Sequence, residues 1–176
     1  MGKTKGLIAY YSHAGNNCVN GNIVNLPLGN TEVMAHLIQK LTGSDIFRVD
    51  TVNAFPEGYQ ETTEVAKEEL RRNVRPGRSG PVDNMADYNV IYLSYPKWWG
   101  TMPMVVFTFL EAYDLAGKTI IPFCTHQGNG MGRSESDIRR LCSGANVIKG
   151  LDIRGGSVQN ALDDITDWLR EIGEID

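Results

Sequence analysis

The chain has 176 residues, of which 41% are hydrophobic and 22% charged, and its formal net charge is -4. These values are typical of one soluble globular domain. The mildly acidic balance argues against nucleic acid as a partner, and no apolar run approaches the roughly 20 residues that cross a membrane.

Three cysteines, Cys18, Cys124 and Cys142, show neither the spacing of a metal site nor that of a disulfide framework. We therefore expect reduced thiols, no metal site and a cytoplasmic location. The short N-terminal apolar run continues into Tyr10 and Tyr11, and we interpret it as a first strand, not as a signal peptide.

Segments with strand and helix character alternate along the chain. Buried strands are predicted from short apolar runs without alternation, and helices from apolar residues that recur three and four positions apart. Pro103 is expected in the first turn of its helix, and Ser134 is expected to begin a capping motif. The expected strands are residues 7–11, 45–49, 90–95, 119–124 and 146–153, and the expected helices are residues 31–41, 61–72, 101–112, 134–141 and 158–172.

Five strand–helix alternations without a break in composition predict one doubly wound α/β domain, residues 1–176. An insert follows the first strand at residues 17–28. It contains Asn20-Gly21, a strong hairpin signal, and we expect a small hairpin there.

The loops that follow the strands are the places to look for a ligand, because parallel sheets bind ligands at the carboxyl ends of their strands. Gly29-Asn30-Thr31 opens the first helix, where backbone N–H groups and hydroxyls suit a phosphate, and Ser12 lies at the end of the first strand. No expected helix directly follows Gly15-Asn16 in the sequence. No Walker or Rossmann glycine motif occupies this loop.

The loop after the third expected strand contains Trp98, Trp99 and Gly100, which together offer flat aromatic surfaces and close backbone approach. The loop after the fourth strand is rich in glycine from Gly128 to Gly132. These features favour a planar aromatic ligand that carries a phosphate.

With these loops, and above all with the stretch YPKWWGTMPMVVFTFLE at residues 95–111, the chain resembles the flavodoxin family. The resemblance implies a three-layer α/β/α fold, a five-stranded parallel sheet of order 2-1-3-4-5, and noncovalently bound FMN. It places Ser12, Asn30 and Thr31 at the FMN phosphate, Trp99-Gly100 at the isoalloxazine, and residues 128–130 at its pyrimidine end.

The sequence departs from the family pattern in two places. Ala14 stands where a hydroxyl is usual, and no stacking tyrosine follows the fourth strand, where His126 and Gln127 lie instead. The candidate cofactor-binding residues are Ser12, His13, Ala14, Asn30, Thr31, Pro96, Trp98, Trp99, Gly100, Thr125, His126, Gly128, Asn129 and Gly130, and no residue is assigned a catalytic role.

The resemblance leaves the function open between two main classes. We lean towards an oxidoreductase that passes electrons from NADH or NADPH to a quinone-like acceptor. The alternative is a single-electron carrier between partner redox proteins, and a flavodoxin fold without flavin is a third possibility. Arginines 71, 72, 75 and 78 could attract a nicotinamide cofactor's phosphates, but a solvated helix face is the better interpretation.

Overall fold

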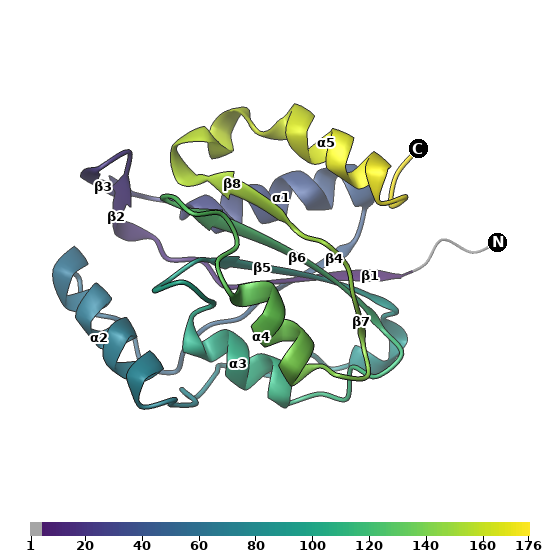
Figure 1. The fold of residues 1–176 in the computed structure, drawn as a ribbon, viewed down its shortest axis with the longest axis horizontal. Coiled ribbons are helices and arrows are strands. Elements are labelled where there is room, and N and C mark those ends of the chain that lie inside the picture. Colours follow the sequence, from purple (N-terminus) through teal and green to yellow (C-terminus); the bar gives the residue numbers. More distant parts are fainter. Residues whose placement is uncertain (1–4) are drawn as a thin grey trace.

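The buried apolar runs of the sequence form a parallel sheet between two layers of helices (Figure 1). The structure is a computed structural model that describes residues 5–176, so the first four residues of the expected domain lie outside it. The strands are β1 (Gly6–Tyr10), β4 (Asp45–Arg48), β5 (Val90–Pro96), β6 (Thr119–His126), β7 (Asn146–Val147) and β8 (Leu151–Arg154).

The sheet order is β4-β1-β5-β6, with both β7 and β8 paired to β6, and all of these pairs are parallel. This confirms the doubly wound fold and the 2-1-3-4-5 order. The single fifth strand expected over residues 146–153 is instead two short strands that pair with opposite ends of β6. The break falls at Gly150, which lies against the Pro122 carbonyl so closely that a side chain has no room.

Helices cover both faces of the sheet. Figure 1 shows α1 and α5 on one face and α3 and α4 on the other; α2 packs beside α3 and the inserted hairpin. The helices are α1 (Asn30–Thr42), α2 (Tyr59–Arg71), α3 (Met104–Glu111), α4 (Ser134–Leu141) and α5 (Leu162–Glu171), with 3-10 turns η1 (Met85–Asp87) and η2 (Gly155–Asn160).

Two hydrophobic cores explain why polar and apolar residues do not alternate along the buried strands. In β1, Ile8 packs with Met34 and the rest of the α1–α5 core, whereas Leu7 and Ala9 belong to the core under α3. Successive side chains point to opposite faces of a sheet. Both faces are buried here, so every position of the strand is apolar.

The insert is an antiparallel hairpin of β2 (Gly15–Val19) and β3 (Asn22–Leu26). Its turn residues Asn20 and Gly21 have φ of 51° and 83°, as a tight hairpin turn of the type favoured by Asn-Gly requires. The predicted hairpin is confirmed, although its first strand begins at Gly15, two residues before the expected boundary.

Three helices begin two or more residues away from the sequence prediction: α2 begins at Tyr59 instead of residue 61, and α3 and α5 begin later than expected. Thr101 exchanges two backbone hydrogen bonds with Trp98, and Pro103 is extended, so α3 begins only at Met104. Residues 155–160 form the turn η2, so the last α-helix begins at Leu162 instead of residue 158.

Ser134 was predicted to begin a capping motif, and this is wrong. Ser134 is already the first residue of α4, the preceding Arg133 is in the cap position, and no side chain caps the helix. The Ser134 hydroxyl donates to the Met131 carbonyl at 2.6 Å and pairs with the Tyr95 hydroxyl at 2.8 Å. The side chain therefore fastens the loop after β6 to β5.

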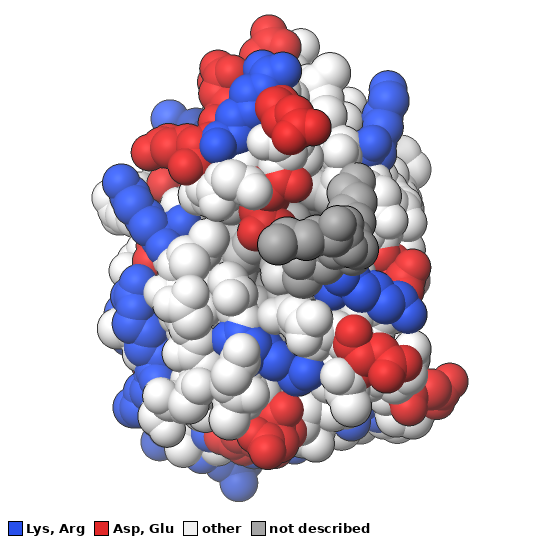
Figure 2. All heavy atoms as spheres, turned by 90° about the vertical axis from the view of Figure 1, so that its right-hand side faces the viewer, with Lys and Arg blue, Asp and Glu red and all other residues white. Residues whose placement is uncertain are grey.

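The surface carries charges of both signs. Figure 2 shows the right-hand side of Figure 1, where acidic and basic side chains are interspersed with neutral ones. Such a face creates no strong field of one sign. Among residues 5–176, no helix combines the length and apolar character needed to cross a bilayer, and no group of His, Cys, Asp and Glu is arranged to hold a metal ion.

Candidate cofactor site

A cavity of about 520 Å³ opens at the carboxyl ends of β1, β5 and β6. Its walls come from the loops after these three strands, the hairpin and the start of α2. The lining residues are His13, Asn16, Asn17, Cys18, Asn30, Thr31, Tyr59, Thr62, Thr63, Ala66, Pro96, Lys97, Trp98, Trp99, Gly100, Thr125, His126, Gln127, Gly128, Asn129 and Gly132. This is the edge at which open α/β sheets bind ligands.

One end of the cavity is polar and contains the N-terminus of α1. Asn30 and Thr31, the first two residues of the helix, both line it. The Thr31 side chain is almost wholly buried, and its hydroxyl pairs with the Thr125 hydroxyl at 2.9 Å. Because the first N–H groups of a helix have no acceptor within it, this end presents partial positive charge to the cavity.

Ser12 lies behind this wall and is not among the lining residues. Its side chain is buried, and its hydroxyl accepts the Glu32 N–H of α1 at 3.1 Å. Arg48 holds the same segment from outside, since it donates to the Ser12 carbonyl at 3.2 Å and pairs with Glu32 at 2.8 Å. Ser12 thus joins the end of β1 to the first turn of α1.

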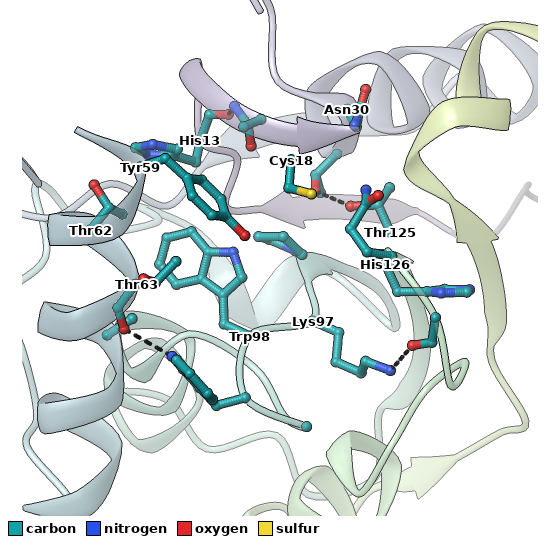
Figure 3. A pocket seen from close by; sticks show the side chains of 18 of the residues that line it. His13, Cys18, Asn30, Tyr59, Thr62, Thr63, Lys97, Trp98, Thr125 and His126 are labelled. Carbon is teal, nitrogen blue, oxygen red and sulfur yellow. Dashed lines mark hydrogen bonds between the residues drawn. The ribbon is translucent and has the colours of Figure 1, made fainter. Parts of the chain in front are cut away.

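The opposite end of the cavity is aromatic. Trp98 makes edge-on contacts with Tyr11, His13 and Phe55 at centroid distances of 5.5, 5.7 and 5.3 Å. Figure 3 shows Tyr59, from the start of α2, directed into the cavity beside Trp98. These rings provide an apolar, planar environment.

Trp99 lines the same cavity from a more exposed position. It has φ of 52° and Gly100 has φ of 85°, a turn geometry that is costly for a tryptophan. The Trp99 indole N–H donates to the Thr63 carbonyl at 2.9 Å, and Lys67 lies 5.1 Å from its ring. The two tryptophans therefore differ. Trp98 lies within an aromatic cluster, whereas Trp99 lies beside α2 and is 48% exposed.

Ionisable groups line both ends of the cavity. His126 Nε2 lies 2.9 Å from an Asp152 carboxylate oxygen, whereas its buried Nδ1 has no hydrogen-bond partner among the described residues. The Lys97 ammonium donates to the Gly128 carbonyl. Burial lowers the pKa of His13, and burial followed by the neighbouring Cys18 raises the pKa of Tyr59.

A family model described as Flavodoxin matches residues 5–172. The chain belongs to the flavodoxin family. Three solved structures share the fold. A Bacteroides uniformis protein is 22% identical over 94% of this chain and 99% of its own, with a TM-score of 0.73. A Lactobacillus acidophilus flavoprotein in complex with FMN is 22% identical over 91% and 99%, with a TM-score of 0.63.

The third, an NADH:FMN oxidoreductase, is 13% identical over 96% of this chain and 89% of its own, with a TM-score of 0.54. No curated protein matches the chain.

Most of the sequence-predicted residues of this flavodoxin-family protein come together in the cavity. Eleven of them line it, namely His13, Asn30, Thr31, Pro96, Trp98, Trp99, Gly100, Thr125, His126, Gly128 and Asn129. Ser12, Ala14 and Gly130 do not. Ala14 faces a smaller cavity behind the hairpin, and Gly130 lies close to the Asp152 carboxylate.

Sequence reasoning missed several lining residues. Tyr59, Thr62 and Thr63 come from α2. The charged sequence of residues 61–72 predicted a partly exposed helix there, Tyr59 precedes that range, and Lys97 was passed over between Pro96 and Trp98. Asn16, Asn17 and Cys18 come from β2, and only the expected hairpin hinted at them. Arginines 71, 72, 75 and 78 do not line the cavity. Arg71 pairs with Glu68, and Arg75 pairs with Glu111.

Proposed function

We propose that this protein binds FMN in the cavity and works as a redox protein through it. Membership of the flavodoxin family and a neighbour crystallised with FMN support FMN as the cofactor. The observation that carries the proposal is the division of the cavity into two ends. Figure 3 shows the aromatic side chains Tyr59 and Trp98 on one side and Asn30, Thr125 and His126 on the other.

This division fits the chemistry of a flavin monophosphate. The N-terminus of α1, with Asn30 and the Thr31 hydroxyl, would hold the phosphate through N–H groups and a hydroxyl. Trp98, Tyr59 and the exposed Trp99 would contact the flavin ring. His126 also lines this end, but its Nδ1 is covered by the protein itself and has no hydrogen-bond partner among the described residues. Bound FMN supplies the redox chemistry, and these residues control its access and surroundings.

Within this redox role, the favoured activity is that of an oxidoreductase that passes electrons from a reduced nicotinamide to a quinone-like acceptor. Two observations support it. The fold is shared with an NADH:FMN oxidoreductase, and the cavity is open and lined by aromatic rings on which a second planar molecule could stack. A cytoplasmic location remains part of this proposal, in keeping with the free thiols.

Two observations favour the alternative, a single-electron carrier that docks to other redox proteins. Within residues 5–176, Lys97 is the only lysine or arginine that lines the cavity, and its ammonium already contacts the Gly128 carbonyl. The phosphates of a nicotinamide dinucleotide are usually bound by such cations. Trp99, exposed at the rim, is the kind of side chain that contributes to a docking surface.

The test is anaerobic mixing of the FMN-loaded protein with NADH and, separately, with NADPH, while the flavin absorbance is followed. Rapid bleaching is the result expected of an oxidoreductase. Dithionite serves as the control for reducibility. If dithionite bleaches the flavin and neither nicotinamide does, the carrier is the better assignment. If the purified protein does not retain added FMN at all, the redox proposal itself is wrong.

A further inference from the structure

The inserted hairpin bridges two sides of the candidate cofactor site. At its base, the Asn16 side chain donates to the Glu57 carbonyl, just before α2, at 2.8 Å. At its tip, the Asn20 N–H donates to the Gln127 side-chain oxygen, in the loop after β6, at 3.2 Å. In Figure 1 the hairpin extends beyond the carboxyl ends of the strands. It therefore lies between residue 57 and the loop after β6, at the same edge of the sheet as the N-terminus of α1.

The tip of the hairpin is packed tightly against the turn η2. A Cβ placed on Gly156 would lie 2.5 Å from both polar atoms of the Asn20 amide. On Gly155 it would lie 2.7 Å from the Asn30 side-chain nitrogen and 2.6 Å from that of Gln127. The two glycines allow the hairpin tip, the loop after β6 and the start of α1 to meet, and together these segments form a rim beside Asn30.

We propose that this rim, fastened by the contact of Asn20 with Gln127 and Gly156, limits the polar end of the cavity to a phosphate monoester. The inference rests on the proposed function. FMN ends at its phosphate, whereas FAD continues from the same phosphate into a second phosphate and adenosine. With the phosphate at the N-terminus of α1, that continuation would meet the hairpin tip and η2. The hairpin thus selects FMN over FAD by excluding the larger ligand, and it slows the release of FMN.

The hairpin can be altered without disturbing the sheet. Gly15 pairs with Leu26, and a Cβ on Gly29 would lie 2.7 Å from the His13 carbonyl oxygen, so the chain leaves and returns at nearly one point. The tip can also be loosened by itself. Glycine readily adopts the positive φ of Asn20, and Asn20→Gly combined with Gln127→Ala removes the fastening while the turn is kept.

The experiment compares the affinities for FMN and FAD by fluorescence titration, and the FMN release rate by rapid dilution. In the intact protein, FAD binds at least a hundredfold more weakly than FMN. In the Asn20→Gly/Gln127→Ala variant this ratio falls at least fivefold, and FMN leaves about fivefold faster, the effect expected from one lost hydrogen bond. Ile23→Thr, on the exposed face of β3 (55% exposed), is the matched control and changes neither value.

In a second variant, residues 15–28 are removed and Ala14 is joined to Gly29. The affinity of this variant for FAD lies within tenfold of its affinity for FMN. Equal affinity of the intact protein for FMN and FAD overturns the inference while the proposed function stands. An unchanged ratio of the FMN and FAD affinities in the folded Asn20→Gly/Gln127→Ala variant also overturns the inference, whether or not the deletion variant folds. Failure of the intact protein to bind either flavin removes the proposed function itself.

Discussion

Replacing Thr31 with valine tests the phosphate end of the site most directly. Valine keeps the branched shape of threonine and replaces the hydroxyl with a methyl group. Thr31 is 2% exposed, and its hydroxyl pairs with Thr125 at 2.9 Å at the start of α1. If this hydroxyl donates to a bound phosphate, its removal costs a hydrogen bond to a charged group.

Such a bond contributes about 1.5–3 kcal/mol, and 1.4 kcal/mol is tenfold in affinity, so the Kd for FMN should rise about 10- to 150-fold. The substitution also leaves the buried Thr125 hydroxyl without its partner. The free energy of unfolding should therefore fall by about 1 kcal/mol even without ligand. The two effects are separable because unfolding is measured on the apoprotein.

The assay is fluorescence titration with FMN and with riboflavin, which has the same ring and ribityl chain but no phosphate. Riboflavin affinity should change less than about twofold, the size of an ordinary surface perturbation. Thr166→Val on α5, where the hydroxyl bonds only to the Leu162 carbonyl, is the matched control. An equal loss for both ligands, or no loss for FMN, refutes the assignment of the phosphate to the N-terminus of α1.

Three further predictions concern the aromatic end and the titratable groups. Trp98→Ala should lower the free energy of unfolding by about 3 kcal/mol because it removes one ring from an aromatic cluster. Trp99→Ala, at a half-exposed ring, should lower it by less than about 1 kcal/mol. Urea unfolding measures both values. Burial lowers the pKa of His13 below 6.5, so the unfolded state binds more protons and stability should fall as pH drops below about 6.5. His13→Gln should remove that part of the slope. Burial raises the pKa of the Cys124 thiol to about 12. The half-exposed Cys18, which lines the cavity, should therefore react first with a disulfide reagent at pH 8, and bound FMN should slow that reaction.

Each of these has a contrary outcome. Equal losses for the two tryptophan variants would show that Trp99 is as well packed as Trp98. A stability slope that His13→Gln leaves unchanged would assign the pH dependence to other groups. A fast thiol that persists in Cys18→Ser, or that FMN does not protect, would place the accessible cysteine outside the cavity.

The local elements of this fold were predictable because each follows from a short stretch of chain. The apolar run before Tyr11 predicts β1, and the spacing of Met34 and Ile38 predicts α1. Asn20-Gly21 predicts the hairpin turn, since both residues adopt positive φ at little cost. The start of α3 was not predictable in this way, because the pairing of Thr101 with Trp98 competes with the helix.

The alternation of strands and helices and the family could thus be read from local patterns of residues. Most of the loops that meet at the site were predictable as well, because parallel strands bring their carboxyl ends to one edge. How the walls of that site are completed depends on the tertiary structure. Tyr59 enters it from α2, Ser12 turns away to α1, and Asn20 reaches Gln127 across 107 positions. Such contacts depend on the packing of distant segments, and no local pattern of residues encodes them.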